Sequence, residues 1–202
     1  MIKISSRAYQ AVVKRDRYSF PVNSKPILNI ATQNSQATRP KVVGSMKDQF
    51  TAFLTTGKRS VDEWETYYLQ TCNGRAKIQA ATDLLYNYLN KMPVDHSVFT
   101  RDLAEKYITE LTINKTHYGM SGEYHSVLAA AAYFDSGFRF STAEEESHGI
   151  DAWINDRPVQ VKPHDSVKMH HVRNHADTDR TLVITYEAKK DCCYIHNPEF
   201  MD

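Results

Sequence analysis

Three polar side chains stand out in a short, otherwise apolar stretch of the sequence: Asp151, Gln160 and Lys162. A two-residue turn that begins at Asn155 or at Asp156 folds this stretch into a hairpin and places Asp151 opposite Gln160 or Lys162. In both registers the three side chains share one face, because directly opposed residues of a hairpin point the same way. The other face is apolar and comprises Ile150, Ala152, Ile154, Val159 and Val161. A slip by one residue would bury the charges, so the pattern predicts the register as well as the hairpin.

The carboxylate, amide and amine of this face suit metal-assisted hydrolysis of a phosphodiester. Asp151 can bind a hard divalent cation, and Gln160 and the carbonyl of Val161 can add oxygen ligands. Lys162 can orient or help deprotonate the attacking water and hold the phosphate. A carboxylate is a better ligand for such a cation than an amide, so we expect Gln160→Glu to keep or increase metal use. The alternative interpretation is an ordinary cross-strand ion pair between Asp151 and Lys162.

Other charged residues near the hairpin have two interpretations each. Glu123 begins an amphipathic stretch that we expect to pack on the sheet, where its carboxylate can face the same cation or merely favour a helix N-terminus. The run Glu144–Glu146 is expected to be a solvated strand or turn edge, from which one carboxylate can reach the metal. His148, beside Gly149, is a candidate phosphate contact or a structural residue.

The elements that position these residues follow a mainly helical first two-thirds of the chain. Residues 1–30 are expected to be irregular or short-stranded, because prolines interrupt them, and the polar stretch 30–40 is expected to be a loop. Apolar residues then recur at helical spacing in four stretches, about 42–54, 60–73, 76–89 and 100–112. The aromatic residues of the second stretch, Trp64, Tyr67 and Tyr68, are expected mostly in the core.

Local signals mark the ends of these helices. Ser60, with Glu63 three residues later, has the form of a capping box. Gly57 and Gly74 are expected to end the first two helices. A turn over Gly119–Gly122 is expected to precede an Ala-rich helix of about residues 123–135. One face of the third helix carries Ile78, Ala81, Leu84, Leu85 and Tyr88.

After Gly137 the pattern changes to short runs with alternation and β-branched residues, which are typical of strands. These runs are Phe138–Thr142, Gly149–Ile154, Val159–Lys162, Thr181–Glu187 and Cys192–His196. The sequence has no internal repeat and no linker-like stretch. We therefore expect a single domain over residues 1–202, in which a helical recognition and dimerisation region, 1–118, precedes a catalytic core, 119–202.

A Gly-Ile-Asp, a short hairpin and a Gln-x-Lys, preceded by a helix that bears Glu, resemble the PD-(D/E)XK nuclease superfamily, and the Gln variant resembles its Mrr-like members. The resemblance covers about residues 120–196. The short motif occurs often by chance, so its weight comes from the matching strand faces and the upstream helix. Two positions depart from the usual pattern: Ile150 replaces a Pro, and Gln160 replaces an acid. The resemblance implies an α/β (α+β) fold class, a restriction-endonuclease-like core with a mixed central sheet.

A second resemblance lies in residues 27–44, Ile-Leu-Asn-Ile-Ala-Thr-Gln-Asn-Ser-Gln-Ala-Thr-Arg-Pro-Lys-Val-Val-Gly. This block is similar to the opening block of the archaeal CTAG-cutting type II restriction endonucleases, the MjaI family. A match of this length is harder to obtain by chance than the short nuclease motif. It implies a Mg²⁺-dependent homodimer, in which Mn²⁺ can substitute, that cuts double-stranded DNA at a short palindrome.

Two polar segments are candidates for DNA contact. Gln and Asn pair with adenine and Arg with guanine, so the candidates of the first segment are Gln33, Asn34, Gln36, Arg39 and Lys41. The alternative is a polar loop that caps the next helix. The second segment runs from His164 to Arg173 and adds Lys168, His171 and Arg173 as phosphate or base contacts. His171 and His175 also have the i,i+4 spacing of zinc ligands on a helix, but no Cys pair stands at ligand spacing.

Composition narrows the class of protein. With 25 basic and 24 acidic residues the net charge is +1, which argues against a nucleic-acid binder held by charge alone. No apolar run approaches the ~18 residues of a membrane-spanning helix, so no membrane partner is expected. The opening MIKISSRAYQ has no apolar signal core, and three Cys make a poor disulfide framework; both favour the cytoplasm.

These observations favour a type II restriction-like endonuclease acting on double-stranded DNA. The enzyme alternative is a repair or structure-specific nuclease built on the same core. The alternative that is not an enzyme is a DNA-binding protein with a degenerate nuclease core, which Gln160 in place of an acid would permit.

Overall fold

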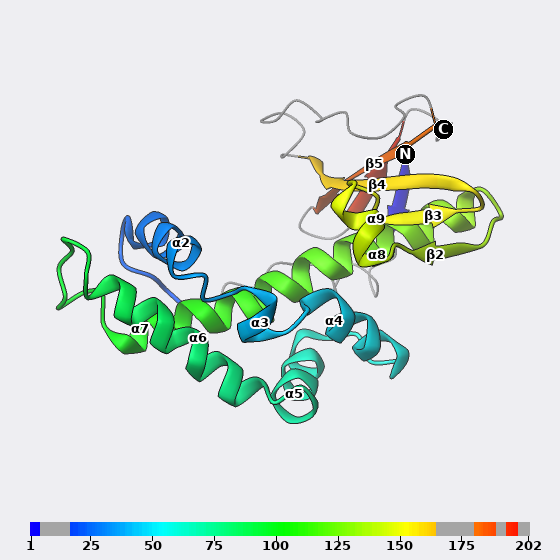
Figure 1. Ribbon diagram of the computed structural model, residues 1–202. Helices are drawn as coiled ribbons and strands as arrows, with labels where there is room; N and C mark the ends of the chain where they lie inside the picture. The colour runs from blue at the N-terminus through cyan, green and yellow to red at the C-terminus, as the bar shows by residue number, and fades with distance from the viewer. Residues whose placement is uncertain (5–16, 165–179, 189–192, 198–202) are drawn as a thin grey trace. The chain divides into compact units, whose positions relative to one another are not determined.

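The computed structural model describes residues 1–4, 17–164, 180–188 and 193–197 of the chain (Figure 1). These residues form two compact units. The helical unit lies within residues 17–118, and the sheet unit comprises the first strand of the chain together with the described residues from Gly119 onward. In the part of the chain so described, no helix is long and apolar enough to cross a membrane.

The helical unit is a succession of short helices, several of which begin at a capping side chain. Ser45, Ser60 and Thr100 stand at three N-caps, where each hydroxyl accepts a hydrogen bond from the main-chain N–H three residues later. At Ser60 the Glu63 carboxylate completes the capping box, which confirms that prediction. The helices of this unit are α2 (Ser24–Ser35), α3 (Pro40–Val43), α4 (Met46–Thr55), α5 (Val61–Thr71), α6 (Gly74–Leu89) and α7 (Arg101–Thr109), followed by the π-helix η1 (Glu110–Lys115). Helix α8 (Thr116–Tyr133) comes next in the chain and belongs to the sheet unit from Gly119 onward.

Aromatic side chains fill the core of the helical unit. Trp64 is fully buried, and its ring centre lies 5.1 Å from that of Phe50 and 5.4 Å from that of Tyr68. The indole N–H donates to the carbonyl of Thr112 at 3.3 Å, so the polar atom of this buried side chain is satisfied. The core interpretation is therefore confirmed for Trp64 and Tyr68, whereas Tyr67 is half-buried.

The start of the helical unit differs from the sequence-based expectation. Helix α2 occupies Ser24–Ser35, where we expected an irregular segment followed by a polar loop. Pro26 does not interrupt it, because it is the third residue of the helix and the first turn of a helix makes no use of its N–H groups. Further on, the expected helix over 42–54 is divided into α3 and α4 by Gly44, whose φ of 83° lies outside the helical range.

The expected turn over Gly119–Gly122 is wrong. Helix α7, η1 and α8 follow one another without an intervening turn, and both glycines lie inside α8. A Cβ on Gly122 would lie 2.7 Å from the ring of Tyr186, so the close approach of the helix to a strand requires glycine there. Gly74, which we expected to end a helix, instead begins α6 and lies against Tyr68.

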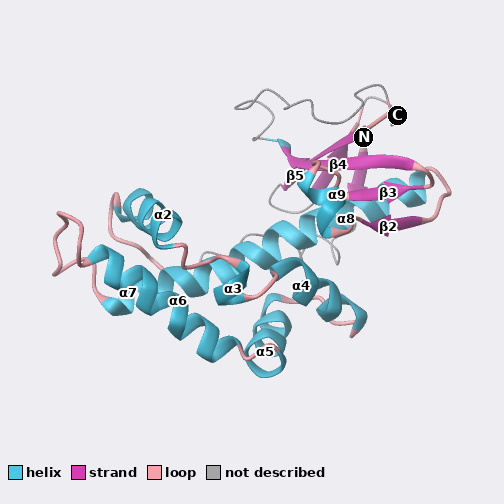
Figure 2. Ribbon diagram, in the orientation of Figure 1, coloured by secondary structure: helices cyan, strands magenta, loops and turns pink. Residues whose placement is uncertain are grey.

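The described strands form one mixed sheet in the order β1-β6-β5-β4-β3-β2 (Figure 2). All neighbouring strands are antiparallel except β4 and β5, which are parallel. The strands are β1 (Ile2–Ile4), β2 (Phe138–Phe140), β3 (Ala152–Ile154), β4 (Arg157–Pro163), β5 (Leu182–Ala188) and β6 (Cys193–His196), and the short helix α9 (Ala143–Ser147) lies between β2 and β3 in the chain. The expected α+β class with a mixed central sheet is thus confirmed.

One face of this sheet is apolar and is covered by α8. Buried Val161 of β4 lies beside buried Ile184 of β5 on this face. Gly122 of α8 lies against Tyr186, which is two residues beyond Ile184 and therefore on the same face. The alternate residues of β4 point the other way, so Gln160 lies on the opposite, polar face of the sheet.

Candidate functional site

The hairpin forms in one of the two expected registers. Strands β3 and β4 are joined by a turn of two residues, Asn155 and Asp156, and Asn155 has the left-handed φ of 52° that a tight turn requires. The same register, extended by one step, places Asp151 opposite Gln160, with Lys162 two residues further along β4. The other face is buried at Ala152, Ile154, Val159 and Val161 and half-buried at Ile150.

Asp151 is fixed to the neighbouring strand by two hydrogen bonds. Its main-chain N–H donates to the carbonyl of Val159 at 2.8 Å. Its carboxylate Oδ2 accepts from the main-chain N–H of Val161 at 2.7 Å, which is the short distance of a hydrogen bond to a charged group. The carboxylate is therefore held beside Val161, the residue whose carbonyl we expected as a further ligand.

Lys162 lies on the polar face without an ion pair. Its side chain makes no hydrogen bond or ion pair with any residue in the described ranges, so the alternative of a cross-strand pair with Asp151 is not formed. The side chain is half-buried. The half-buried ammonium of Lys162 can therefore bind an anion without first breaking an ion pair with another residue.

The amide of Gln160 has one definite orientation. Its Nε2 donates to the main-chain carbonyl of Gly149 at 3.0 Å. A carbonyl only accepts, so the amide nitrogen must be the atom that faces it, and the amide oxygen points elsewhere. Within the described chain no donor is hydrogen-bonded to that oxygen. The oxygen of Gln160 thus has no hydrogen bond from the described chain, and its role as a ligand stays a prediction; the nitrogen has a contact that the sequence did not predict.

Helix α9 holds the chain just before Asp151. Thr142 and Glu145 form a capping box at its start, and the guanidinium of Arg139 binds both carboxylate oxygens of Glu145, at 2.7 and 2.9 Å. The bonds from Arg139 and from the Thr142 N–H lower the pKa of Glu145 to about 2. The run Glu144–Glu146 is thus helical rather than a strand or turn edge, and Glu145 has a structural partner.

Glu123 and His148 have different surroundings. Glu123 is half-buried on α8, next to Gly122, which packs on the apolar face; its approach to Asp151 stays a prediction. His148 is exposed, and its Nδ1 lies 2.9 Å from the carbonyl of Glu144. Because a carbonyl only accepts, Nδ1 carries the proton there. The Nδ1 atom of His148 thus has a structural contact with α9. Phosphate contact through the other ring nitrogen, Nε2, stays a prediction.

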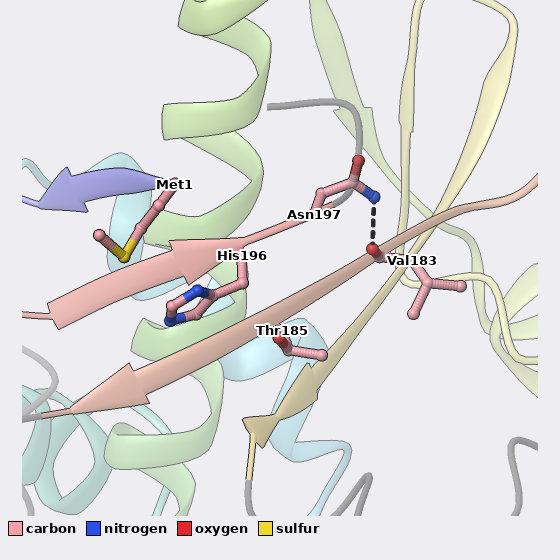
Figure 3. Close-up of a pocket in the computed structure, with 5 residues that line it drawn as sticks. All are labelled: Met1, Val183, Thr185, His196 and Asn197. Atoms are coloured by element: carbon pink, nitrogen blue, oxygen red, sulfur yellow. Dashed lines mark hydrogen bonds between the residues drawn. The ribbon is translucent and has the colours of Figure 1, made fainter. Parts of the chain in front are cut away.

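A cavity of about 420 Å³ opens on the polar face beside the hairpin, and sequence reasoning did not single out its residues (Figure 3). Its lining comprises Met1, Val183, Thr185, His196 and Asn197. Val183 pairs with Gln160 and Thr185 with Lys162 across β4 and β5, so both lie on the polar face. Figure 3 shows the Asn197 amide, which donates to the Val183 carbonyl at 2.6 Å. The alternation of buried and half-buried residues along β5 follows its period of two, which was the sequence signal that could have placed Val183 and Thr185 on the polar face.

The first predicted DNA-contacting segment lies in the helical unit, and its five candidate residues are exposed. Its candidates span the end of α2, the connection and the start of α3, and they are Gln33, Asn34, Gln36, Arg39 and Lys41. The amide of Asn34 donates to the carbonyl of Ile30 at 2.9 Å, and Gln36 closes α2 with a left-handed φ of 56°. The segment is therefore helix and cap rather than a loop, and DNA contact stays a prediction.

The second predicted segment is described only at its first residue. His164 follows β4, and its ring centre lies 5.4 Å from that of His196. Lys168, His171, Arg173 and His175 lie outside the described residues. Among the residues that the structure describes, no three His, Cys, Asp or Glu side chains form a group that could hold a metal ion. The ligand set predicted for the hairpin is of another kind, since it uses an amide and a main-chain carbonyl.

A mixed sheet in an α+β unit, with an anchored carboxylate, an oriented amide and an unpaired lysine on its central hairpin, is typical of the restriction-endonuclease-like class. Comparison with family models agrees with this class. The chain belongs to the MjaI restriction endonuclease family, whose model matches residues 25–196. The family contains site-specific deoxyribonucleases, so the chain is a restriction endonuclease.

Two curated relatives are similar over most of their length. The chain is 29% identical over 184 residues to the type II restriction enzyme MjaI of Methanocaldococcus jannaschii, which is 90% of this chain and 82% of that enzyme. It is 29% identical over 178 residues to the type II restriction enzyme MthZI of Methanothermobacter thermautotrophicus, 88% of this chain and 84% of that enzyme. No solved structure matches the chain.

Proposed function

We propose that this restriction endonuclease is a type II enzyme that hydrolyses both strands of double-stranded DNA at a short palindrome, CTAG, with Mg²⁺ as its cofactor. The observation that carries the proposal is the arrangement of the hairpin. The Asp151 carboxylate is fixed by the Val161 N–H at 2.7 Å, and the Gln160 amide is oriented by Gly149 at 3.0 Å. Lys162 stands on the same face with no partner among the residues described.

The donor set of the hairpin fits a hard divalent cation. A carboxylate oxygen of Asp151, the amide oxygen of Gln160 and the carbonyl of Val161 are all oxygen ligands, which suit Mg²⁺ and Mn²⁺ rather than zinc. Glu123 is the candidate for a further carboxylate. When bound, the cation supplies charge that polarises the scissile phosphate and lowers the pKa of the attacking water. The orientation of the Gln160 amide supports this fit, because its oxygen accepts no hydrogen bond from the described chain and could therefore bind a cation.

The protein residues have separate tasks in this proposal. Lys162 holds the phosphate through its charge and positions the water, since an ammonium without an acidic partner is free to bind an anion. Asp151 keeps its orientation because its second contact is a main-chain N–H, which does not move with a side-chain rotamer. The half-buried position of Lys162 strengthens its interactions with the phosphate and with the water, because solvent screens them less than at an exposed site.

The proposal includes a homodimer and a division of labour between segments. Two copies provide one active site for each strand, and the two-fold symmetry of such a dimer matches a palindrome. The exposed residues Gln33, Asn34, Gln36, Arg39 and Lys41 are the proposed readers of the bases. His148 adds a contact beside the hairpin.

The proposal is tested by incubating the purified chain with plasmid DNA and Mg²⁺, with EDTA and the Lys162→Ala variant as controls. Discrete fragments whose sequenced ends share one short palindrome are the expected result. Binding without cleavage would instead identify a DNA-binding protein with a degenerate core. Cleavage at structures or nicks rather than at one sequence would identify a repair nuclease.

A further inference from the structure

The Gln160 side chain contacts the chain that leads to Asp151. We propose that Gln160 is a positioning residue, whose amide nitrogen holds the Gly149–Asp151 segment in place, so that a carboxylate cannot replace the amide. The inference rests on the proposed function for its catalytic consequence. It goes beyond that function because it assigns a task to the nitrogen, whereas ligation uses only the oxygen.

Two consecutive residues of β4 hold the two ends of the Gly149–Asp151 segment. The Nε2 of Gln160 donates to the carbonyl of Gly149 at 3.0 Å. The N–H of Val161, the next residue, donates to the carboxylate of Asp151 at 2.7 Å. A displacement of the Gly149 carbonyl is therefore transmitted over two residues to the carboxylate that we propose as a metal ligand.

Gly149 leaves room for this contact. Its φ of 82° is in the left-handed region, which favours glycine. A Cβ at this position would lie 3.2 Å from Nε2 of Gln160, closer than an ordinary van der Waals contact. The backbone of Gly149 thus allows the amide of Gln160 to reach its carbonyl.

The other side of the segment is held by helix α9. The N–H of Gly149 donates to the carbonyl of Glu146 at 2.8 Å, and the N–H of Ile150 donates to that of Glu145 at 3.1 Å. The side chain of Glu145 is in turn bound by Arg139 at 2.7 Å. Among the described residues, Gln160 provides the hydrogen bond from β4 to Gly149 that opposes α9, so its loss leaves Gly149 with only the α9 contact there.

A carboxylate at position 160 would reverse this contact. An ionised Glu only accepts hydrogen bonds, so its oxygen would face the Gly149 carbonyl without a proton between them. The superior ligand strength of a carboxylate led us to expect that Gln160→Glu keeps or increases metal use. The contact with Gly149 predicts the opposite, and the two explanations rank the variants differently. If only the side-chain oxygen matters, the cleavage rate is highest with Glu at position 160, lower with Gln and lowest with Met. If the nitrogen matters, the rate with Gln at this position exceeds the rates with Glu and with Met.

The test compares the wild-type chain with Gln160→Glu and Gln160→Met, which has nearly the same size and no polar end. We expect the single-turnover cleavage rate with Mg²⁺ to fall roughly 10- to 100-fold in both variants, as for residues that orient metal ligands, with an unchanged dissociation constant for DNA. In the metal-free proteins, we expect the amide hydrogens of Gly149, Ile150 and Asp151 to exchange roughly five- to tenfold faster. Thr66→Val, an isosteric change at an exposed position of α5, should alter neither quantity.

The outcomes separate the two proposals. A Gln160→Glu variant that cuts as fast as the wild type, or faster, overturns the positioning role. Unchanged amide exchange in Gln160→Met also overturns it, and this variant keeps the test valid if the Glu variant does not fold. If the wild-type chain with Mg²⁺ cuts no DNA, the proposed function fails, whereas the exchange measurements still decide whether Gln160 holds the segment.

Discussion

The two units hold their candidate functional side chains in opposite ways. In the sheet unit, Asp151 and Gln160 are each bound to main-chain atoms, at 2.7 and 3.0 Å, and both are half-buried. In the helical unit, four of the five candidates are exposed and make no side-chain hydrogen bond or ion pair within the described chain, namely Gln33, Gln36, Arg39 and Lys41. Catalysis requires fixed distances between the catalytic groups and the substrate, whereas base recognition requires side chains whose hydrogen-bonding groups are still free to bind a base.

The two units also differ in what keeps them folded. The helical unit depends on large aromatic side chains in contact, centred on Trp64. The sheet unit depends on smaller aliphatic residues along one face, such as Val161 and Ile184, and on a helix that comes close at Gly122. The difference predicts distinct consequences for substitutions in each unit.

The largest effect is expected from removing the charges of the hairpin. Asp151→Asn and Lys162→Ala should each lower the cleavage rate by roughly 10²–10³-fold or more, while the protein stays folded and binds DNA. Asn keeps an acceptor for the Val161 N–H, so the geometry survives and only the charge is lost. Without metal, Asp151→Asn should bind DNA more tightly, because a carboxylate that repels phosphate is removed. Plasmid cleavage and gel-shift assays measure both quantities, and full cleavage by both variants would refute this site.

The next effect concerns the stability of the helical unit. Trp64→Ala should lower the free energy of unfolding by about 3–5 kcal/mol, because the side chain is fully buried among other aromatic rings. Leu84→Ala is the matched control on α6. Leu84 is 41% exposed, so its loss should cost less than about 0.5 kcal/mol. Denaturant unfolding of the two variants measures the contrast, and equal losses would contradict the aromatic core.

Two glycines of α8 should respond with opposite signs. Gly122→Ala places a Cβ 2.7 Å from Tyr186 and should destabilise the sheet unit by about 1–3 kcal/mol. Gly119→Ala meets no atom within 4 Å and should stabilise the helix by about 0.5–1 kcal/mol. Thermal unfolding of the pair decides the matter. A stabilised Gly122→Ala would show that α8 does not need its close approach to β5.

The helical unit's role in reading DNA is tested at Arg39. Arg39→Ala should lose about 1–3 kcal/mol of binding at the cognate site and relax one base position if the side chain contacts a base. A contact with phosphate would weaken all sequences equally and make the salt dependence shallower. Arg75→Ala removes an exposed arginine of α6 in the same unit and should leave specificity unchanged. Affinities for the cognate site and its single-base variants, at several salt concentrations, distinguish these cases.

The smallest effects concern the two capping boxes, one in each unit. Hydrogen bonds from Ser60 and Arg59 lower the pKa of Glu63 to about 2, from an ordinary value of 4.5. Because the folded pKa is the lower one, this stabilisation is complete above about pH 4.5 and is lost as the pH falls towards 2. Ser60→Ala should cost about 1 kcal/mol at pH 7. Glu63→Gln should flatten the fall in stability between these pH values, which denaturant unfolding at pH 7 and pH 3 measures.

The corresponding change in the sheet unit should affect activity instead. Glu145 has a similarly lowered pKa, about 2, but its partners Arg139 and Thr142 belong to the support of the Gly149–Asp151 segment. Glu145→Gln should therefore slow cleavage, whereas Glu63→Gln should leave the cleavage rate unchanged. Equal rates for the two variants would contradict the idea that α9 supports the hairpin.

The hairpin was predictable because its information is local. Strict alternation with a period of two fixes which residues share a face, and a two-residue turn allows few registers. The observed turn, Asn155 and Asp156, is one of the two that the sequence allowed. The contact between Gln160 and Gly149 was not predictable, because it depends on the left-handed backbone of Gly149 and on the position of α9.

The helical unit was less predictable at its polar start and at its glycines. Helix α2 has few apolar residues, so its polar end resembled a loop, although its first turn tolerates Pro26. Gly119 and Gly122 resembled a turn because glycine is a poor helix former in isolation. Contacts distant in sequence outweighed this preference, since Gly122 meets Tyr186 of β5.

The sequence by itself determined the chemistry of this protein: a carboxylate, an amide and a lysine on one face of a hairpin, with an apolar face behind them. It also indicated the family, through the block of residues 27–44, and the family model that matches residues 25–196 confirms it. Only the tertiary structure decided how these groups are held. The strand pairing aligned Asp151 with the N–H of Val161, and the folding of α9 brought the Gly149 carbonyl to Gln160. The physical reason is that alternation specifies the face on which a side chain lies, whereas its hydrogen-bond partner depends on backbone brought there by other elements.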